Sequence, residues 1–138
     1  NSKYSKQSWQ AHQDNSYLGN ENGMYITVNV AYGHMSKKNG GLRLYPGSHK
    51  RGRIDAENKI SYRDKDGKPG NKIKIKLPMS PVQINLEKGD VLFMHGLCVH
   101  ESSDNNSNIP RPLLSLGYMP FGENFDPGFN SKRKALLL

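Results

Sequence analysis

Four side chains in this sequence have the types and order needed for a redox-active metal site. His12 and Asp14 lie two residues apart, His100 lies far downstream, and Arg111 follows His100 by eleven residues. Two histidines and one carboxylate are the ligand set of non-heme Fe(II) oxygenases, which keep coordination positions open. If these residues converge, the sequence predicts an iron site that activates O2, with an arginine beside it for an acidic co-substrate.

The spacing of His12 and Asp14 suits a shared metal. Side chains two apart on an extended segment face the same way, which leaves Gln13 on the other side. His100 lies just past an apolar run at 91–94, so it can enter the same cavity from a neighbouring strand. Three ligands on one side leave room for a bidentate 2-oxo acid and for O2. A chance His-x-Asp pair has odds of about one in four, so a surface turn capped by Asp14 is the alternative.

Two further residues can hold the acid. Arg111 precedes an apolar stretch at 113–119, and its guanidinium can bind a carboxylate through two parallel hydrogen bonds. Ser102, two residues beyond His100, can add a hydroxyl to the same carboxylate. The alternative for a lone arginine is a surface ion pair.

The elements that must position these residues are short strands separated by turns. The clearest strand alternates aliphatic residues with a mixed polar set that includes Asn29, so its polar face can line a cavity. No stretch has sustained helical periodicity, and the pattern predicts an all-β antiparallel sandwich or jelly roll. Strands are predicted at 24–32, 42–45, 72–77, 82–86, 91–94 and 113–119.

The chain length favours a single domain. With 138 residues, of which 34% are hydrophobic, we expect one oxygenase core over 1–138. Residues 1–23 are expected to form a loop that carries the first metal ligands, 24–119 the jelly-roll core, and 120–138 a C-terminal tail. Within the core, 50–71 is predicted to be a long charged loop.

Charge and composition limit the partners. The net charge is +8, and residues 50–76 hold ten Lys/Arg against four Asp/Glu. This basic segment has only Tyr62 as an aromatic, so we interpret it as a solvated loop and strand edge and expect no nucleic-acid partner. Attraction of an anionic substrate is the alternative. No apolar run is long enough to cross a membrane and no leader is visible, so no membrane partner is expected. The lone Cys98 indicates a reducing, cytoplasmic location.

Four motifs, taken together and in order, resemble the phytanoyl-CoA dioxygenase (PhyH) family. The resemblance runs from about Trp9 to Met119 and implies a double-stranded β-helix, which is a cupin-like jelly roll. It also implies Fe(II), 2-oxoglutarate as co-substrate, O2 and a small-molecule substrate. The motifs are Trp9 with His12-Gln13-Asp14, then 39–49, 89–102 and 105–116.

The family pattern assigns roles to six residues. By resemblance, His12, Asp14 and His100 bind iron, and Arg111 and Ser102 bind the distal carboxylate of 2-oxoglutarate. Asn29 falls where the family often places another co-substrate contact. Halogenating relatives replace the carboxylate ligand with a small residue, so the presence of Asp14 favours hydroxylation, with release of succinate and CO2.

The chain departs from the family pattern in length. Family members are considerably longer, and only eleven residues precede His12 here. We therefore expect a barrel that lacks the N-terminal buttressing elements. Two alternatives to the dioxygenase follow: a non-catalytic jelly-roll remnant that binds metal or mediates assembly, and a cupin-like metalloenzyme that does not use 2-oxoglutarate.

Several other residues are candidates for the surroundings of the site. Tyr17 and Leu18 are expected to wall the substrate, and Trp9 either walls the site or packs in the core. His95 lies five residues before His100 and is interpreted as a supporting histidine, with a role as surrogate metal ligand as the alternative.

Overall fold

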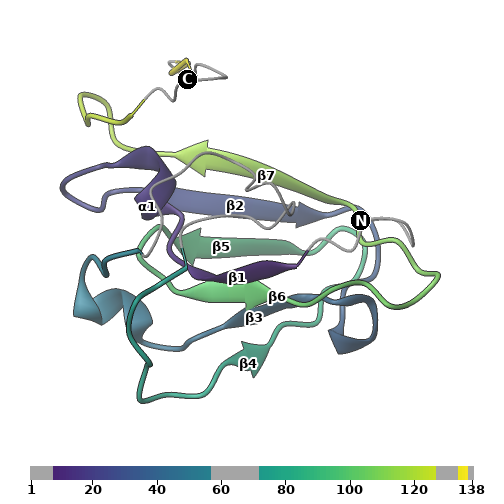
Figure 1. The fold of residues 1–138 in the computed structure, drawn as a ribbon. Helices are drawn as coiled ribbons and strands as arrows, with labels where there is room; N and C mark the ends of the chain where they lie inside the picture. Colours follow the sequence, from purple (N-terminus) through teal and green to yellow (C-terminus); the bar gives the residue numbers. More distant parts are fainter. Residues whose placement is uncertain (1–7, 57–71, 127–133, 137–138) are drawn as a thin grey trace, which may run out of the picture.

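The computed structural model describes residues 8–56, 72–126 and 134–136, and its strands form two antiparallel sheets (Figure 1). One sheet has the order β1-β6-β3-β4 and the other β5-β2-β7. The strands are β1 (Trp9–His12), β2 (Ile26–Ala31), β3 (Leu42–Leu44), β4 (Val82–Gln83), β5 (Val91–His95), β6 (His100–Ser102) and β7 (Leu113–Tyr118). Short helical turns are α1 (Asn15–Leu18), η1 (Lys37–Asn39) and η2 (Ser48–Arg51).

The strand pairs are nested along the chain. Strand β3 pairs with β4, β2 pairs with β5, and β1 pairs with β6, each antiparallel. The chain crosses repeatedly between the two sheets, which is the path of a folded hairpin wound into a double-stranded β-helix. The predicted all-β jelly roll is therefore confirmed.

Strand β2 lies at the centre of the smaller sheet, between β5 and β7. Successive side chains of a strand point to opposite faces, so Thr27 and Asn29 share one face with Met94 of β5. All three are buried, since this face is turned towards the other sheet. The mixed polar face predicted for 24–32 is thus the inner face.

The outer face of the same sheet is apolar and exposed. A continuous apolar run such as 91–94 predicts a buried strand, and this prediction is wrong for the outer face: Phe93 is 70% exposed and Val91 is 45% exposed. Among the described residues no element covers this face. Its apolar and aromatic side chains that are more than a third exposed are Ile26, Val91, Phe93, Leu114, Leu116 and Tyr118.

Other strand predictions need correction. The Lys/Ile alternation at 72–77 predicted a strand, but only Ile73 forms an isolated bridge, to Ala56. Ile73 and Leu77 are buried in a cluster with Ile54 and Val99, while the intervening Ile75 is exposed. The strand predicted at 82–86 is limited to β4. Residues 1–23 contain β1 and α1, which a loop prediction missed, and residues 57–71 of the predicted charged loop lie outside the described residues.

One glycine allows two loops to approach closely. Gly40 ends η1 with φ of 74°, and a Cβ at this position would lie 2.4 Å from the carbonyl oxygen of Ser103. Only glycine fits such a contact without displacement. The contact holds the turn before β3 against the segment that follows β6.

In the described part of the chain, no helix is long and apolar enough to span a membrane.

Candidate metal centre

The three predicted metal ligands converge in space. His12 ends β1 and lies opposite His100 on β6. The Nε2 atoms of His12 and His100 lie 3.6 and 3.4 Å from Oδ1 of Asp14, and all three ligand atoms lie within 4.8 Å of one another. Two ligands at right angles, each about 2.1 Å from a metal, are about 3 Å apart. The observed separations are close to that arrangement, so the group fits one metal ion.

A β-bulge turns two side chains of β1 inward. Trp9 pairs with Ser102 and His12 pairs with His100, so the three-residue step on β1 matches a two-residue step on β6. The extra residue changes the alternation of the strand. As a result Trp9 and His12 both face the interior, with ring centroids 5.7 Å apart.

The sequence analysis expected an extended segment from His12 to Asp14, but the segment is not extended at Asp14. Asp14 has φ of −59° and ψ of −34°, which is helical geometry, and it directly precedes α1. The amide of Asn15 donates to the carbonyl of Gly96 at 3.0 Å and fixes this turn against the loop before β6. The helical turn, rather than strand alternation, brings the carboxylate back beneath the imidazole of His12.

Both imidazoles present the same nitrogen to the centre. Nδ1 of His12 lies 2.6 Å from the carbonyl oxygen of Gln10, and Nδ1 of His100 lies 3.1 Å from that of Cys98. A carbonyl only accepts, so Nδ1 carries the proton in each ring and Nε2 is free to bind a metal. Burial and the nearby His12 lower the pKa of His100 from 6.5 to about 4, which keeps its ring neutral at neutral pH.

The carboxylate of Asp14 is held by several partners. Burial opposes its ionisation, but His100, His12 and a hydrogen bond from the Thr27 hydroxyl to Oδ2 outweigh this effect and lower its pKa well below the usual range. An ionised carboxylate and two neutral imidazoles are the protonation states that a divalent metal requires.

Gln13, between the two ligands, is fully buried and points away from them. Its Nε2 donates to the carbonyls of Gly52 and Leu97 at 2.9 and 2.8 Å, and its Oε1 accepts from the amide of Ile54 at 2.9 Å. The side chain therefore ties β1 to the segment after η2 and to the loop before β6. It fixes the backbone from which His12 and Asp14 extend.

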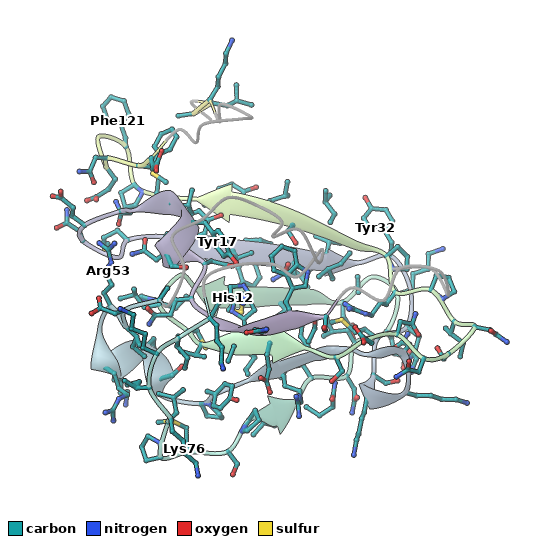
Figure 2. All side chains as sticks on the ribbon, viewed as in Figure 1. His12, Tyr17, Tyr32, Arg53, Lys76 and Phe121 are labelled. Atoms are coloured by element: carbon teal, nitrogen blue, oxygen red, sulfur yellow. The ribbon has the colours of Figure 1, made fainter. Side chains whose placement is uncertain are left out.

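Two aromatic rings flank His12. The ring of Tyr17, on α1, meets that of His12 edge-on (Figure 2), with ring centroids 5.5 Å apart. The ring centroids of Tyr17 and Trp9 are 6.4 Å apart. Burial, together with the charge of Asp14, raises the pKa of Tyr17. The structure thus places Tyr17 and Trp9 beside the metal group, while Leu18 is buried within the short helix turn.

Arg111 and Ser102 lie next to each other in the interior. Both side chains are buried, and Nη2 of Arg111 lies 3.5 Å from Oγ of Ser102 and 3.5 Å from the carbonyl of Ser103. Burial lowers the pKa of Arg111, an effect opposed by Asp104, but an arginine stays charged. Ser102 lies two residues beyond His100 on the same face of β6.

Asn29 is also buried on the inner face of β2. Its Oδ1 accepts a hydrogen bond from Oγ of Ser115 at 2.6 Å, whereas its buried Nδ2 has no hydrogen-bond partner among the described residues. A buried amide donor without a partner is costly, so this atom is suited to a ligand that enters the interior.

His95 lies outside the metal group. It is exposed, its ring contacts that of His49 at a centroid distance of 5.4 Å, and its Nδ1 accepts from the amide of Leu97.

A hollow of about 610 Å³ also lies away from the metal centre. Gln10 and Glu101 line it, and they point to the opposite face from His12 and His100.

Comparison with known proteins identifies the family. The family model described as phytanoyl-CoA dioxygenase (PhyH) matches residues 1–113. The chain belongs to the phytanoyl-CoA dioxygenase family. The protein phytanoyl-CoA dioxygenase 1 of Oryza sativa subsp. japonica is 31% identical over 107 residues, which are 76% of this chain and 36% of that relative. The resemblance predicted from the motifs is confirmed.

Solved structures share the fold. The non-heme monooxygenase ThoJ, in its apo form, has a TM-score of 0.68 and 25% identity, over 84% of this chain and 41% of that chain. The non-heme alpha ketoglutarate dependent carbocyclase SnoK has a TM-score of 0.67 and 23% identity, over 94% and 54%. For the epimerase SnoN the values are 0.61 and 24%, over 83% and 40%. The chain spans about a third of the curated relative and about two fifths to a half of these solved chains.

Sequence reasoning missed two residues of the centre, Thr27 and Gln13. Thr27 carries a signal in the sequence: it is a polar residue two positions from Asn29, on the strand face that was expected to line a cavity. Gln13 carries none, because its three partners are backbone groups from segments distant along the chain.

Proposed function

We propose that the protein is an Fe(II)- and 2-oxoglutarate-dependent dioxygenase that hydroxylates a small organic substrate. The observation that carries this proposal is the convergence of two Nε2 atoms from buried histidines and one carboxylate oxygen within 4.8 Å of one another. Two imidazoles and one carboxylate leave positions open on Fe(II). Membership of the phytanoyl-CoA dioxygenase family supports the same chemistry.

Within this proposal, His12, Asp14 and His100 hold the iron. When bound, Fe(II) with 2-oxoglutarate and O2 supplies the oxidation of an unactivated C–H bond, with succinate and CO2 as co-products. The side chains contribute a fixed ligand geometry, and Tyr17 and Trp9 exclude water from the side of His12.

Arg111, Ser102 and Asn29 are proposed to bind 2-oxoglutarate. Residues two apart on one face of a strand are about 6.6 Å apart, so Ser102 lies about this far from His100. Arg111 lies beside Ser102. A five-carbon diacid can span the distance from the metal position to this pair. The guanidinium would pair with the distal carboxylate, and the hydroxyl of Ser102 would donate to it. The buried Nδ2 of Asn29 supports a further hydrogen bond to the same molecule.

The test is anaerobic addition of Fe(II) and 2-oxoglutarate to the protein. We expect a visible metal-to-ligand charge-transfer band, which His100→Ala abolishes and Arg111→Ala weakens by raising the concentration of 2-oxoglutarate required. A wild-type protein without this band would sink the proposal. An Arg111→Ala variant indistinguishable from wild type would instead favour a cupin-like metalloenzyme that does not use 2-oxoglutarate.

Release of succinate separates catalysis from binding. The solved relatives include an epimerase and a carbocyclase, so the outcome at the substrate carbon has to be measured directly. Fe(II) binding without succinate formation on exposure to O2 would contradict the catalytic part of the proposal.

A further inference from the structure

The two oxygens of Asp14 have different surroundings. Oδ1 lies between the two histidines, 3.6 Å from Nε2 of His12 and 3.4 Å from Nε2 of His100. Oδ2 accepts the hydroxyl of Thr27. Because an ionised carboxylate only accepts, the hydroxyl must be the donor. One oxygen is therefore directed at the metal position, and the other is occupied by a protein group.

The position of Thr27 is fixed more firmly than that of Asp14. Thr27 lies in the central strand of its sheet, paired with Met94 on one side and with Gly117 on the other. It is 6% exposed, and its branched side chain has restricted rotation about χ1. Asp14 is the second residue after β1 ends and lies outside both sheets. The hydrogen bond thus anchors a side chain on a turn to a rigid strand of the opposite sheet.

We propose that Thr27 is a positioning residue that makes Asp14 bind the metal through Oδ1 alone. This inference rests on the proposed metal site. A six-coordinate metal held by two histidines and one carboxylate oxygen keeps three positions, enough for a bidentate 2-oxo acid and for O2. A carboxylate that bound through both oxygens would fill one of them. Thr27 therefore preserves the position that the reaction needs, although its own atoms do not touch the metal.

The test counts water molecules on bound Mn(II), which replaces Fe(II) and is paramagnetic, by pulsed EPR in ¹⁷O-enriched water. We expect three waters in the wild-type protein and two in Thr27→Val, which keeps the branched shape but removes the hydroxyl. Thr27→Ser, which restores the hydroxyl, should return the count to three. Three waters in Thr27→Val, or two in the wild type, would overturn the proposal.

Two controls keep the result interpretable. If Thr27→Val does not fold by circular dichroism, Thr27→Ala carries the same expectation of two waters, since it also lacks the hydroxyl. His100→Ala tests the underlying site: unchanged Mn(II) affinity in this variant would refute the metal centre itself. Loss of affinity in His100→Ala together with an unchanged water count in the Thr27 variants would refute only the role of Thr27.

Discussion

The two faces of the β5-β2-β7 sheet reverse the usual distribution of side chains, in which apolar residues are buried and polar residues are exposed. On the inner face, β2 buries the polar side chains of Thr27 and Asn29. On the outer face, the same sheet exposes Phe93 and Leu116. Burial of polar groups costs free energy unless they find partners, and exposed apolar patches are rare without a function.

The difference shows where each face obtains its stability. The inner face is specified by hydrogen bonds: Thr27 to Asp14, and Ser115 to Asn29. Within the described residues, no covering layer packs on the outer face. The inner face is therefore committed to the site, while the outer face contributes little to the stability of this chain. Substitutions can test this contrast between hydrogen-bonded interior positions and exposed positions.

The largest difference in the free energy of unfolding is expected between substitutions at two neighbouring residues of β5. Met94 is 3% exposed on the inner face, and Phe93 is 70% exposed on the outer face. Met94→Ala should lower the free energy of unfolding by about 2–5 kcal/mol, because it leaves a cavity. Phe93→Ala should lower it by less than about 1 kcal/mol. Urea denaturation measures both. Equal losses would mean that the outer face is packed in solution.

The next contrast lies within β1 and the turn that follows it. Gln13→Leu removes three buried hydrogen bonds and leaves Gly52, Leu97 and Ile54 with unsatisfied backbone groups. We expect a loss of about 3 kcal/mol in the free energy of unfolding, again from urea denaturation. The matched control is Gln10→Leu, at an exposed glutamine in β1, which should change stability by less than about 0.5 kcal/mol.

A comparable result for Gln10→Leu and Gln13→Leu would contradict the anchoring role of Gln13. A second measurement sharpens the test. Because Gln13 holds the backbone of both His12 and Asp14, the variant should also weaken metal binding, by about 10- to 100-fold, the range typical of groups that support metal ligands.

Alternation explains both the success and the failure of the fold prediction. The period-two pattern at 24–32 correctly located β2 and its inner polar face, since pattern and environment agree there. The equally regular Lys/Ile pattern at 72–77 failed. The buried pair Ile73 and Leu77 is spaced four apart, and within the described residues the segment forms only one isolated bridge, between Ile73 and Ala56. The pattern records which side chains are apolar, but partners distant in sequence decide whether a strand forms.

The site was predictable in its residue types but not in its geometry. The ligand types of His12, Asp14 and His100 indicated iron, and the structure brings these residues together. The bulge in β1, the helical turn at Asp14 and the hydrogen bond from Thr27 could not be predicted. Each depends on register between strands or on contacts across the two sheets, which local sequence does not encode.

The last effect, and the smallest over a single pH unit, is the acid sensitivity of the metal group through His100 of β6. In the unfolded chain the imidazole of His100 takes up a proton near pH 6.5, whereas in the folded, metal-free protein its pKa is about 4. Between these values only the unfolded state binds the proton, so stability is intact above pH 6.5 and falls as the pH decreases towards 4. The loss should reach at most about 1.4 kcal/mol for each pH unit.

Urea denaturation at several pH values across this window measures the slope, and His100→Asn should flatten it. Asp14 does not contribute there, because its lowered pKa makes stability fall only at pH values below its ordinary 3.8. The control is His34, an exposed histidine that pairs with Glu87 at 2.9 Å. His34→Ala should leave the slope unchanged, because acid sensitivity comes from burial of His100 and not from histidine content. An unchanged slope in His100→Asn would place the titrating group elsewhere and remove one reason to treat the three-residue group as preset for metal.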